Sequence, residues 1–176
     1  YQGNASSSFL SLSEPEDKLL VVNSSSKSFN RTGWRVGWIT HPEYLGEHIA
    51  KLVQISTTGV PEFIQKGFIE GLKNHEFLVQ QVMNNLYVSR DFVYNKMKDW
   101  TKLKINKPES AFYFFFKAHD AKDSISFCKN LIKKSQVGLA PGVAFGKTGD
   151  NFLRLCFDAD VKFLENILNR LEEEFN

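Results

Sequence analysis

The first part of the chain has apolar runs between polar breaks that predict two strands followed by two helices. The run Leu-Leu-Val-Val at residues 19–22 is bounded by polar residues, which predicts a buried strand that ends at Asn23. Residues 34–40 predict a second strand. Pro42 and Pro61 each stand at a position typical of a first helical turn, and apolar residues at helical spacing follow both.

A long amphipathic helix is predicted next, because apolar residues recur at helical intervals from residue 76 to residue 100. Its length of about 25 residues is enough to connect two domains. The pattern that follows is typical of a small α+β unit. Its expected elements are an aromatic strand at 111–116, a helix at 124–135, an edge strand at 137–140, a strand at 151–157 and a helix at 161–175. We place the domain boundary inside the long helix, so the predicted domains are residues 1–85 and 86–176.

Composition and charge narrow the possible functions. Of the 176 residues 42% are hydrophobic and 24% are charged, which is ordinary for a globular protein with a real core. A formal charge of +2 does not favour nucleic acid or an anionic membrane as a partner, and no run of about 18 apolar residues predicts a membrane span. Cys128, Cys156 and four scattered histidines fit neither a disulfide framework nor a metal site. We therefore expect no metal, no nucleic acid, no membrane, and a reducing, cytoplasmic location.

The most informative segment is Asn-Ser-Ser-Ser-Lys-Ser-Phe-Asn-Arg-Thr-Gly-Trp-Arg-Val-Gly-Trp at residues 23–38. The amine of Lys27 can hold an aldehyde covalently, as an imine, if it is uncharged and faces a pocket. The hydroxyls of Ser24 and Ser26 and the planar guanidinium of Arg35 suit the oxygens of a phosphate. A lone lysine after three serines is usually a solvated surface residue. The arginine eight residues later, within Gly-Trp-Arg-Val-Gly, favours the chemical interpretation.

This segment resembles the cofactor-lysine segment of the class I/II aminotransferases, the fold-type I enzymes that use pyridoxal 5′-phosphate. Lys-Pro-Glu-Ser-Ala-Phe-Tyr at 107–113 and Val-Gly-Leu-Ala-Pro-Gly-Val-Ala-Phe-Gly at 137–146, followed by Phe-Leu-Arg-Leu at 152–155, are similar to the small domain of that family. The resemblance implies an α/β fold: the end of a large mixed-sheet domain, a bridging helix and a small α+β domain. It implies that Lys27 forms the Schiff base with the cofactor. It also implies that Arg154 forms a bidentate salt bridge with the substrate α-carboxylate.

Further roles are implied by the same resemblance. Tyr1 lies 26 residues before Lys27 and would be the tyrosine that contacts the cofactor ring oxygen. Thr57 and Thr58 loosely resemble a loop that reaches the partner subunit, and the family's shared sites imply a homodimer. The family's glycine-rich phosphate loop, ring-stacking aromatic residue and ring-nitrogen aspartate have no counterpart in residues 1–176. We therefore expect the C-terminal portion of a longer enzyme, inactive without the missing N-terminal portion of the same enzyme.

The expected activity is transfer of an amino group from an amino acid to a 2-oxo acid. The same fold also supports C–S lyases and enzymes that form a cyclopropane ring, as 1-aminocyclopropane-1-carboxylate synthase does, and the lysine motif does not separate these. An aminotransferase-like regulator that binds the cofactor without turnover is a third alternative. The residues do not identify the amino donor, and only Arg31 is a candidate for binding an acidic side chain.

Overall fold

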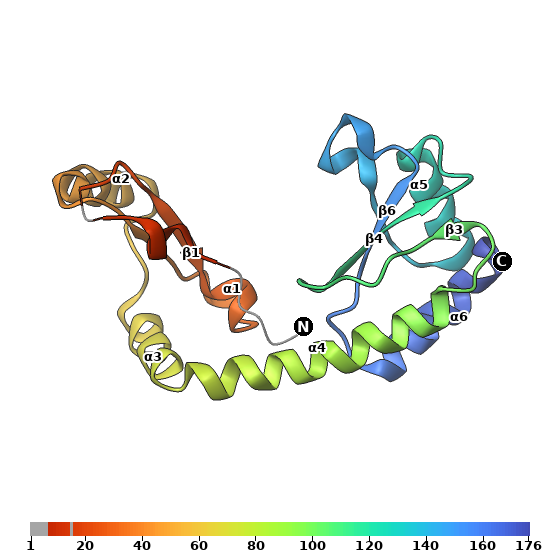
Figure 1. The fold of residues 1–176 in the computed structure, drawn as a ribbon, viewed down its shortest axis with the longest axis horizontal. Coiled ribbons are helices and arrows are strands. Elements are labelled where there is room, and N and C mark those ends of the chain that lie inside the picture. The colour runs from red at the N-terminus through yellow and green to blue at the C-terminus, as the bar shows by residue number, and fades with distance from the viewer. Residues whose placement is uncertain (1–6, 15) are drawn as a thin grey trace. The chain divides into compact units, whose positions relative to one another are not determined.

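A computed structural model describes residues 7–14 and 16–176. The chain divides into two compact units, which we call the N-terminal unit (up to Val82) and the C-terminal unit (from Met83 to Asn176). Figure 1 shows the helices and strands of both units.

The N-terminal unit is built on a two-stranded antiparallel sheet flanked by helices. Strand β1 pairs with β2 from Val21 opposite Thr40 to Ser24 opposite Gly37. Phe29, Val36 and Phe68 form a small core, in which the rings of Phe29 and Phe68 meet edge to face at 5.4 Å. The elements of this unit are η1 (Phe9–Leu12), β1 (Val21–Ser24), α1 (Ser25–Ser28), η2 (Thr32–Trp34), β2 (Gly37–Thr40), η3 (Glu43–Leu45), α2 (Gly46–Thr57) and α3 (Glu62–Lys73).

Both predicted strands of this unit exist, but each differs from the prediction. β1 begins two residues later than the apolar run and is not buried, since Val22 is 75% exposed. β2 begins only at Gly37, because Arg35 has a left-handed backbone with φ 55° that cannot continue a strand. The prediction of a buried strand was therefore wrong for the described part of the chain, where β1 has only β2 beside it.

The predicted long helix is α4, from His75 to Met97. It begins in the N-terminal unit and ends in the C-terminal unit. Its buried side chains all lie in its second half, where α4 belongs to the C-terminal unit: Leu86, Ser89, Arg90, Val93 and Met97. Among the described helices, none is long and apolar enough to cross a lipid bilayer.

The C-terminal unit contains a four-stranded antiparallel sheet in the order β3-β4-β6-β5. Its elements are β3 (Leu103–Lys104), β4 (Tyr113–Ala118), α5 (Ser124–Ser135), β5 (Ala140–Pro141), η4 (Gly142–Phe145), η5 (Lys147–Gly149), β6 (Phe152–Cys156) and α6 (Val161–Phe175). Helices α5 and α6 have the predicted bounds, whereas the strand predicted at 137–140 is reduced to β5 and β3 was not predicted.

Burial alternates along the two central strands and gives the sheet two different faces. Phe114, Phe116 and Leu153 are fully or almost fully buried, and Phe116 meets Phe175 of α6 edge to face at 6.0 Å. Burying a side chain of this size contributes about 1.5–3 kcal/mol, so this face carries the core of the unit. The intervening residues, with Arg154 at the centre of β6, are exposed or half-buried and point to the other face.

Candidate functional site

The predicted cofactor lysine lies on a single helical turn directly after β1. Ser24 is the N-cap of α1, and its hydroxyl accepts a hydrogen bond from the backbone N–H of Ser26 at 3.1 Å. Lys27 is the third residue of this turn, and its side chain is exposed. The strand end and the cap thus bring Ser24, Ser26 and Lys27 together on one short segment.

The segment is fixed by a residue that the sequence did not single out. Ser25 is fully buried, and both its backbone N–H and its hydroxyl donate to the carbonyl oxygen of Val36, each at 3.0 Å. These two bonds connect the helical turn that carries Lys27 to the residue next to Arg35, eleven positions along the chain. Ser25 is the middle one of three identical serines, so no sequence signal distinguishes it from its neighbours.

The backbone around Arg35 explains part of the Gly-x-Arg-x-Gly pattern. Arg35 adopts φ 55°, a left-handed conformation that costs a residue with a Cβ about 1–2 kcal/mol. Backbone strain of this kind is found preferentially at functional sites. Gly37 is needed for close approach, because a Cβ there would lie 2.7 Å from the carbonyl oxygen of Asn23 on β1. Gly33 has open space around it, so its identity has no steric reason in this unit.

The guanidinium of Arg35 is held by a backbone contact and has no acidic partner among the described residues. Its Nη1 donates to the carbonyl oxygen of Thr32 at 2.8 Å, and no carboxylate of the described chain forms an ion pair with it. Arg35 lines a cavity of about 660 Å³ together with Trp38 and Ile64. Lys27 is exposed and does not line this cavity, so its role at a pocket stays a prediction.

Three other candidates from the sequence receive less support or none. Tyr1 lies outside the described residues, so its role remains a prediction. Thr58 ends α2 with a left-handed backbone (φ 62°), as a C-cap does, which gives it a structural role. Arg31 is exposed, donates to the carbonyl of Asn30 at 3.2 Å and lines a cavity of about 380 Å³, so its role stays a prediction.

In the C-terminal unit, Arg154 lies among aromatic rings on the open face of the sheet. It occupies the middle of β6, opposite Phe115 on β4 and Ala140 on β5. Its guanidinium carbon is 4.2 Å from the ring centroid of Tyr113 and 4.2 Å from that of Phe145. Such cation–π contacts contribute about 0.5–1 kcal/mol each at exposed sites. The sequence suggested Arg154 for carboxylate binding but did not show that these two rings would hold it.

The N–H groups of Arg154 find no acceptor in the described part of the chain. No carboxylate there lies within ion-pair distance, and no carbonyl or hydroxyl oxygen accepts a hydrogen bond from it. Aromatic faces attract the positive charge, but they do not replace the strong, paired hydrogen bonds that a carboxylate offers. The side chain is therefore positioned and keeps its hydrogen-bonding capacity for an anionic ligand.

The loop that supplies Phe145 is tightly fixed. Gly142 and Gly149 cross so closely that a Cβ on Gly149 would lie 2.1 Å from the carbonyl oxygen of Gly142. The buried hydroxyl of Ser124 donates to Asp150 Oδ1 at 3.0 Å and accepts from the backbone N–H of Val143 at 3.4 Å. These contacts close the loop on both sides of η4 and η5, so Phe145 is carried by a rigid support.

The described residues give little support for cysteine catalysis or for metal binding. Burial raises the pKa of the Cys128 thiol, which makes it a poor nucleophile. Within residues 7–14 and 16–176, no group of three or more His, Cys, Asp or Glu side chains is arranged to hold a metal ion. Among the described residues, Lys27, Arg35 and Arg154 therefore remain the strongest candidates for function.

Comparison with known proteins identifies the family of the chain. The family described as aminotransferase class I and II matches residues 1–171. The aspartate aminotransferase of Thermotoga maritima is 32% identical over 170 residues, which cover 96% of this chain and 43% of that protein. A probable aspartate aminotransferase of Methanocaldococcus jannaschii is 30% identical over 90% of this chain and 43% of its own length. The chain thus spans less than half the length of these curated relatives.

Solved structures confirm the predicted fold class, an α/β fold that forms the C-terminal part of a fold-type I transferase. The crystal structure of the Thermotoga maritima aspartate aminotransferase matches with a TM-score of 0.81 at 31% identity, over 96% of this chain and 43% of that one. The aspartate aminotransferase of Rhizobium meliloti matches with a TM-score of 0.82 at 28% identity, over 98% of this chain and 46% of that one. With the family match over nearly the whole chain, the chain belongs to the class I and II aminotransferases.

Proposed function

We propose that this chain is the C-terminal portion of a pyridoxal-phosphate-dependent aminotransferase that moves an amino group from an amino acid to a 2-oxo acid. The observation that carries the proposal is the pair of hydrogen bonds from Ser25 to the Val36 carbonyl oxygen, each 3.0 Å long. They hold the turn with Lys27 and the segment with Arg35 in one fixed arrangement. An amine, hydroxyls and a guanidinium on one support are the groups that an aldehyde bearing a phosphate requires.

The residues of the N-terminal unit would hold the cofactor. Lys27 Nζ would bind its aldehyde carbon covalently, and the hydroxyls of Ser24 and Ser26 with the guanidinium of Arg35 would bind its phosphate. Tyr1 would contact the ring oxygen. When bound, pyridoxal phosphate supplies the electron sink for loss of the substrate α-proton.

During the reaction, Lys27 and Arg154 would have different tasks. Once the incoming amino acid has replaced Lys27 on the cofactor, the freed amine of Lys27 would accept the proton from the substrate α-carbon. It would then donate this proton to the C4′ atom of the cofactor. Arg154 would bind the substrate carboxylate through two parallel N–H donors and so orient the α-carbon. Tyr113 and Phe145 would hold the guanidinium in place while it does so.

The proposal extends to organisation and partners. It assigns residues 1–85 to the cofactor-binding domain and residues 86–176 to the small domain. It includes a homodimer, a cytoplasmic location, and an N-terminal portion of the same enzyme that supplies the groups absent from residues 1–176. The 176-residue chain alone is expected to show no transamination.

The test uses the longer protein, expressed with its N-terminal portion. In the unmutated longer protein, borohydride reduction should fix the cofactor permanently on Lys27. Peptide mass spectrometry should then locate the cofactor on the peptide that contains Lys27. A Lys27→Ala variant should lose both this adduct and the visible absorbance band of a lysine-bound cofactor, and it should form no 2-oxo acid from a panel of amino donors. Lys18, an exposed lysine outside the motif, serves as the control, and Lys18→Ala should retain the band and the activity. A band that survives in Lys27→Ala would refute the assignment.

A further inference from the structure

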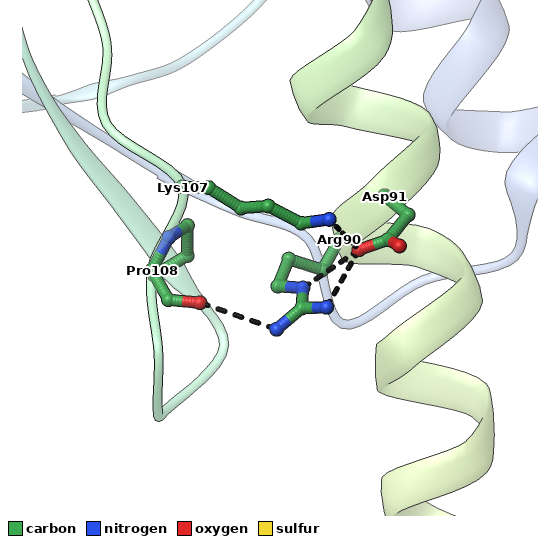
Figure 2. Close-up of polar contacts among 4 residues, drawn as sticks. All are labelled: Arg90, Asp91, Lys107 and Pro108. Atoms are coloured by element: carbon green, nitrogen blue, oxygen red, sulfur yellow. Dashed lines mark hydrogen bonds and ion pairs between the residues drawn. The ribbon is translucent and has the colours of Figure 1, made fainter. Parts of the chain in front are cut away.

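A partly buried ionic cluster connects the loop before β4 to helix α4. Figure 2 shows Arg90 and Asp91 on α4 facing Lys107 and Pro108 on the loop. Arg90 reaches Asp91 Oδ1 through Nε at 2.8 Å and through Nη2 at 2.7 Å, and Lys107 Nζ lies 2.9 Å from the same oxygen. Arg90 Nη1 also donates to the Pro108 carbonyl oxygen at 3.4 Å. One carboxylate oxygen therefore joins a cation of the helix to a cation of the loop.

The cluster is well suited to hold a fixed geometry. The Arg90 side chain is only 5% exposed, and its guanidinium lies 4.3 Å from the ring centroid of Tyr87. Burial tends to raise the pKa of Asp91, but hydrogen bonds and charge from Lys107 and Arg90 outweigh burial and lower that pKa. Asp91 is therefore ionised at neutral pH and compensates a guanidinium that would be costly to bury alone.

The loop leads from this cluster directly to the aromatic contact of Arg154. Ala111 has φ 61°, a conformation that a residue with a Cβ keeps only when its surroundings impose it. The next residue, Phe112, accepts a hydrogen bond at its carbonyl oxygen from the N–H of Phe157 at 3.0 Å. Its ring packs against Tyr113 at 4.4 Å between ring centroids, and Tyr113 contacts Arg154. Only four residues separate the anchor at Pro108 from Tyr113.

We propose that Arg90, Asp91 and Lys107 are positioning residues for carboxylate recognition, because they fix the loop 105–112 on α4 and thereby hold Tyr113 against the guanidinium of Arg154. The functional consequence rests on the carboxylate-binding role proposed for Arg154. The positional link is a property of this chain and can be tested without turnover.

The first experiment follows the Nε–Hε signal of Arg154 by NMR in the longer protein. Ring currents of Tyr113 and Phe145 displace this signal from the position of a solvated arginine. A Tyr113→Leu variant provides the reference for loss of one ring, and Arg154→Lys assigns the signal. In Lys107→Met, which removes the charge and keeps the aliphatic chain, the signal should move towards the Tyr113→Leu position.

Two matched variants make this result specific. Lys107→Arg preserves a cation within reach of Asp91 and should restore the parent signal. Lys134 forms an ion pair with Glu174 at 3.1 Å elsewhere in the same unit, and Lys134→Met should leave the Arg154 signal unchanged. An Arg154 signal that stays in place in both Lys107→Met and Asp91→Asn, or that moves equally in Lys134→Met, would overturn the proposal. Lys107→Met keeps the pair between Arg90 and Asp91, so the fold should be preserved in that variant.

The second experiment measures steady-state kinetics in the longer protein. Lys107→Met should raise KM for the amino donor by roughly two- to fivefold, the factor expected for loss of one partly exposed ion pair, with a smaller change in kcat. Lys107→Arg should restore KM, whereas a purely structural defect would lower the active fraction and leave KM unchanged. If Arg154→Lys has no effect on KM, the proposed role of Arg154 fails, and the NMR result still decides the positional link independently.

Discussion

Replacing Gly149 by alanine should open the loop that places Phe145 beside Arg154. A Cβ at this position would lie 2.1 Å from the Gly142 carbonyl oxygen and 3.1 Å from the Val143 nitrogen. Ordinary van der Waals contacts of a Cβ begin at 3.4 Å, so one of the crossing segments must move by 1.3 Å, the difference between 3.4 Å and 2.1 Å, to reach ordinary contact. Overpacking of a tight site costs about 1–3 kcal/mol. We expect the upper part of this range, because the obstructing atoms belong to the backbone and cannot rotate away.

The free energy of unfolding can be measured in urea with Trp100 as the probe. This side chain is 4% exposed and stacks on Phe175 at 6.0 Å in the same unit as Gly149. Trp34 and Trp38 belong to the N-terminal unit, so both are replaced by phenylalanine to leave a single fluorophore. With a urea dependence of about 1–3 kcal/mol per molar for a small domain, a loss of about 2 kcal/mol lowers the unfolding midpoint by roughly 1 M.

Gly138 is the matched control for this measurement. No heavy atom lies within 4 Å of the Cβ that an alanine would add there, and its backbone does not have a positive φ. Gly138→Ala should therefore be neutral or stabilise the unit by roughly 0.4–1 kcal/mol, because alanine restricts the unfolded chain. An unchanged midpoint in Gly149→Ala, or an equal loss in Gly138→Ala, would show that the crossing does not constrain the loop.

Two further predictions concern the remaining polar contacts. Ser25→Ala removes the hydrogen bond from the hydroxyl to the Val36 carbonyl oxygen and keeps the backbone bond. Because such a hydrogen bond contributes about 0.5–1.5 kcal/mol, the amide proton of residue 25 should exchange with solvent roughly 2- to 12-fold faster. Ser28→Ala is the control and should leave this exchange rate unchanged. The lowered pKa of Asp91 means that its ionic contribution is complete above its unfolded pKa of about 4 and disappears as pH falls through the lower folded value. The stability difference between the parent chain and Asp91→Asn should thus stay constant at neutral pH and shrink below about pH 4, and urea midpoints that differ by the same amount throughout would contradict this.

Local signals allowed α5 and α6 to be predicted with the observed bounds. Asp123 caps α5 by accepting hydrogen bonds from the backbone N–H groups of Ile125 and Ser126. Asp160 caps α6 by accepting from the N–H of Phe163. A capping aspartate followed by apolar residues at helical spacing is a signal contained within a few neighbouring positions. Such elements can be located from the sequence because their ends are set by their own residues.

The strands were predicted less well, because their limits depend on distant partners. β5 has only two residues, and it ends where pairing with β6 ends rather than where its apolar residues end. The β2 strand is shortened by the left-handed backbone of Arg35, which no residue type at that position signals. The bonds from Ser25 to Val36 and the two rings beside Arg154 are also contacts between separate segments of the chain. The charged residues of the candidate site could be predicted from the sequence through a family resemblance. The hydrogen bonds and aromatic contacts that position these residues could not.

An arginine whose charge is neutralised by a carboxylate of the same chain differs from one that has no such partner in the described residues. The first kind is structural, and the second kind is suited to bind a ligand. The buried guanidinium of Arg90 is neutralised by Asp91, so its charge is satisfied within the fold. Arg35 has a strained backbone and Arg154 is half-buried among aromatic rings, yet neither has a carboxylate partner in the described chain. A cation that is partly removed from water without a counter-charge costs free energy. An anion supplied from outside would provide the missing counter-charge, and we therefore expect a phosphate at Arg35 and a carboxylate at Arg154.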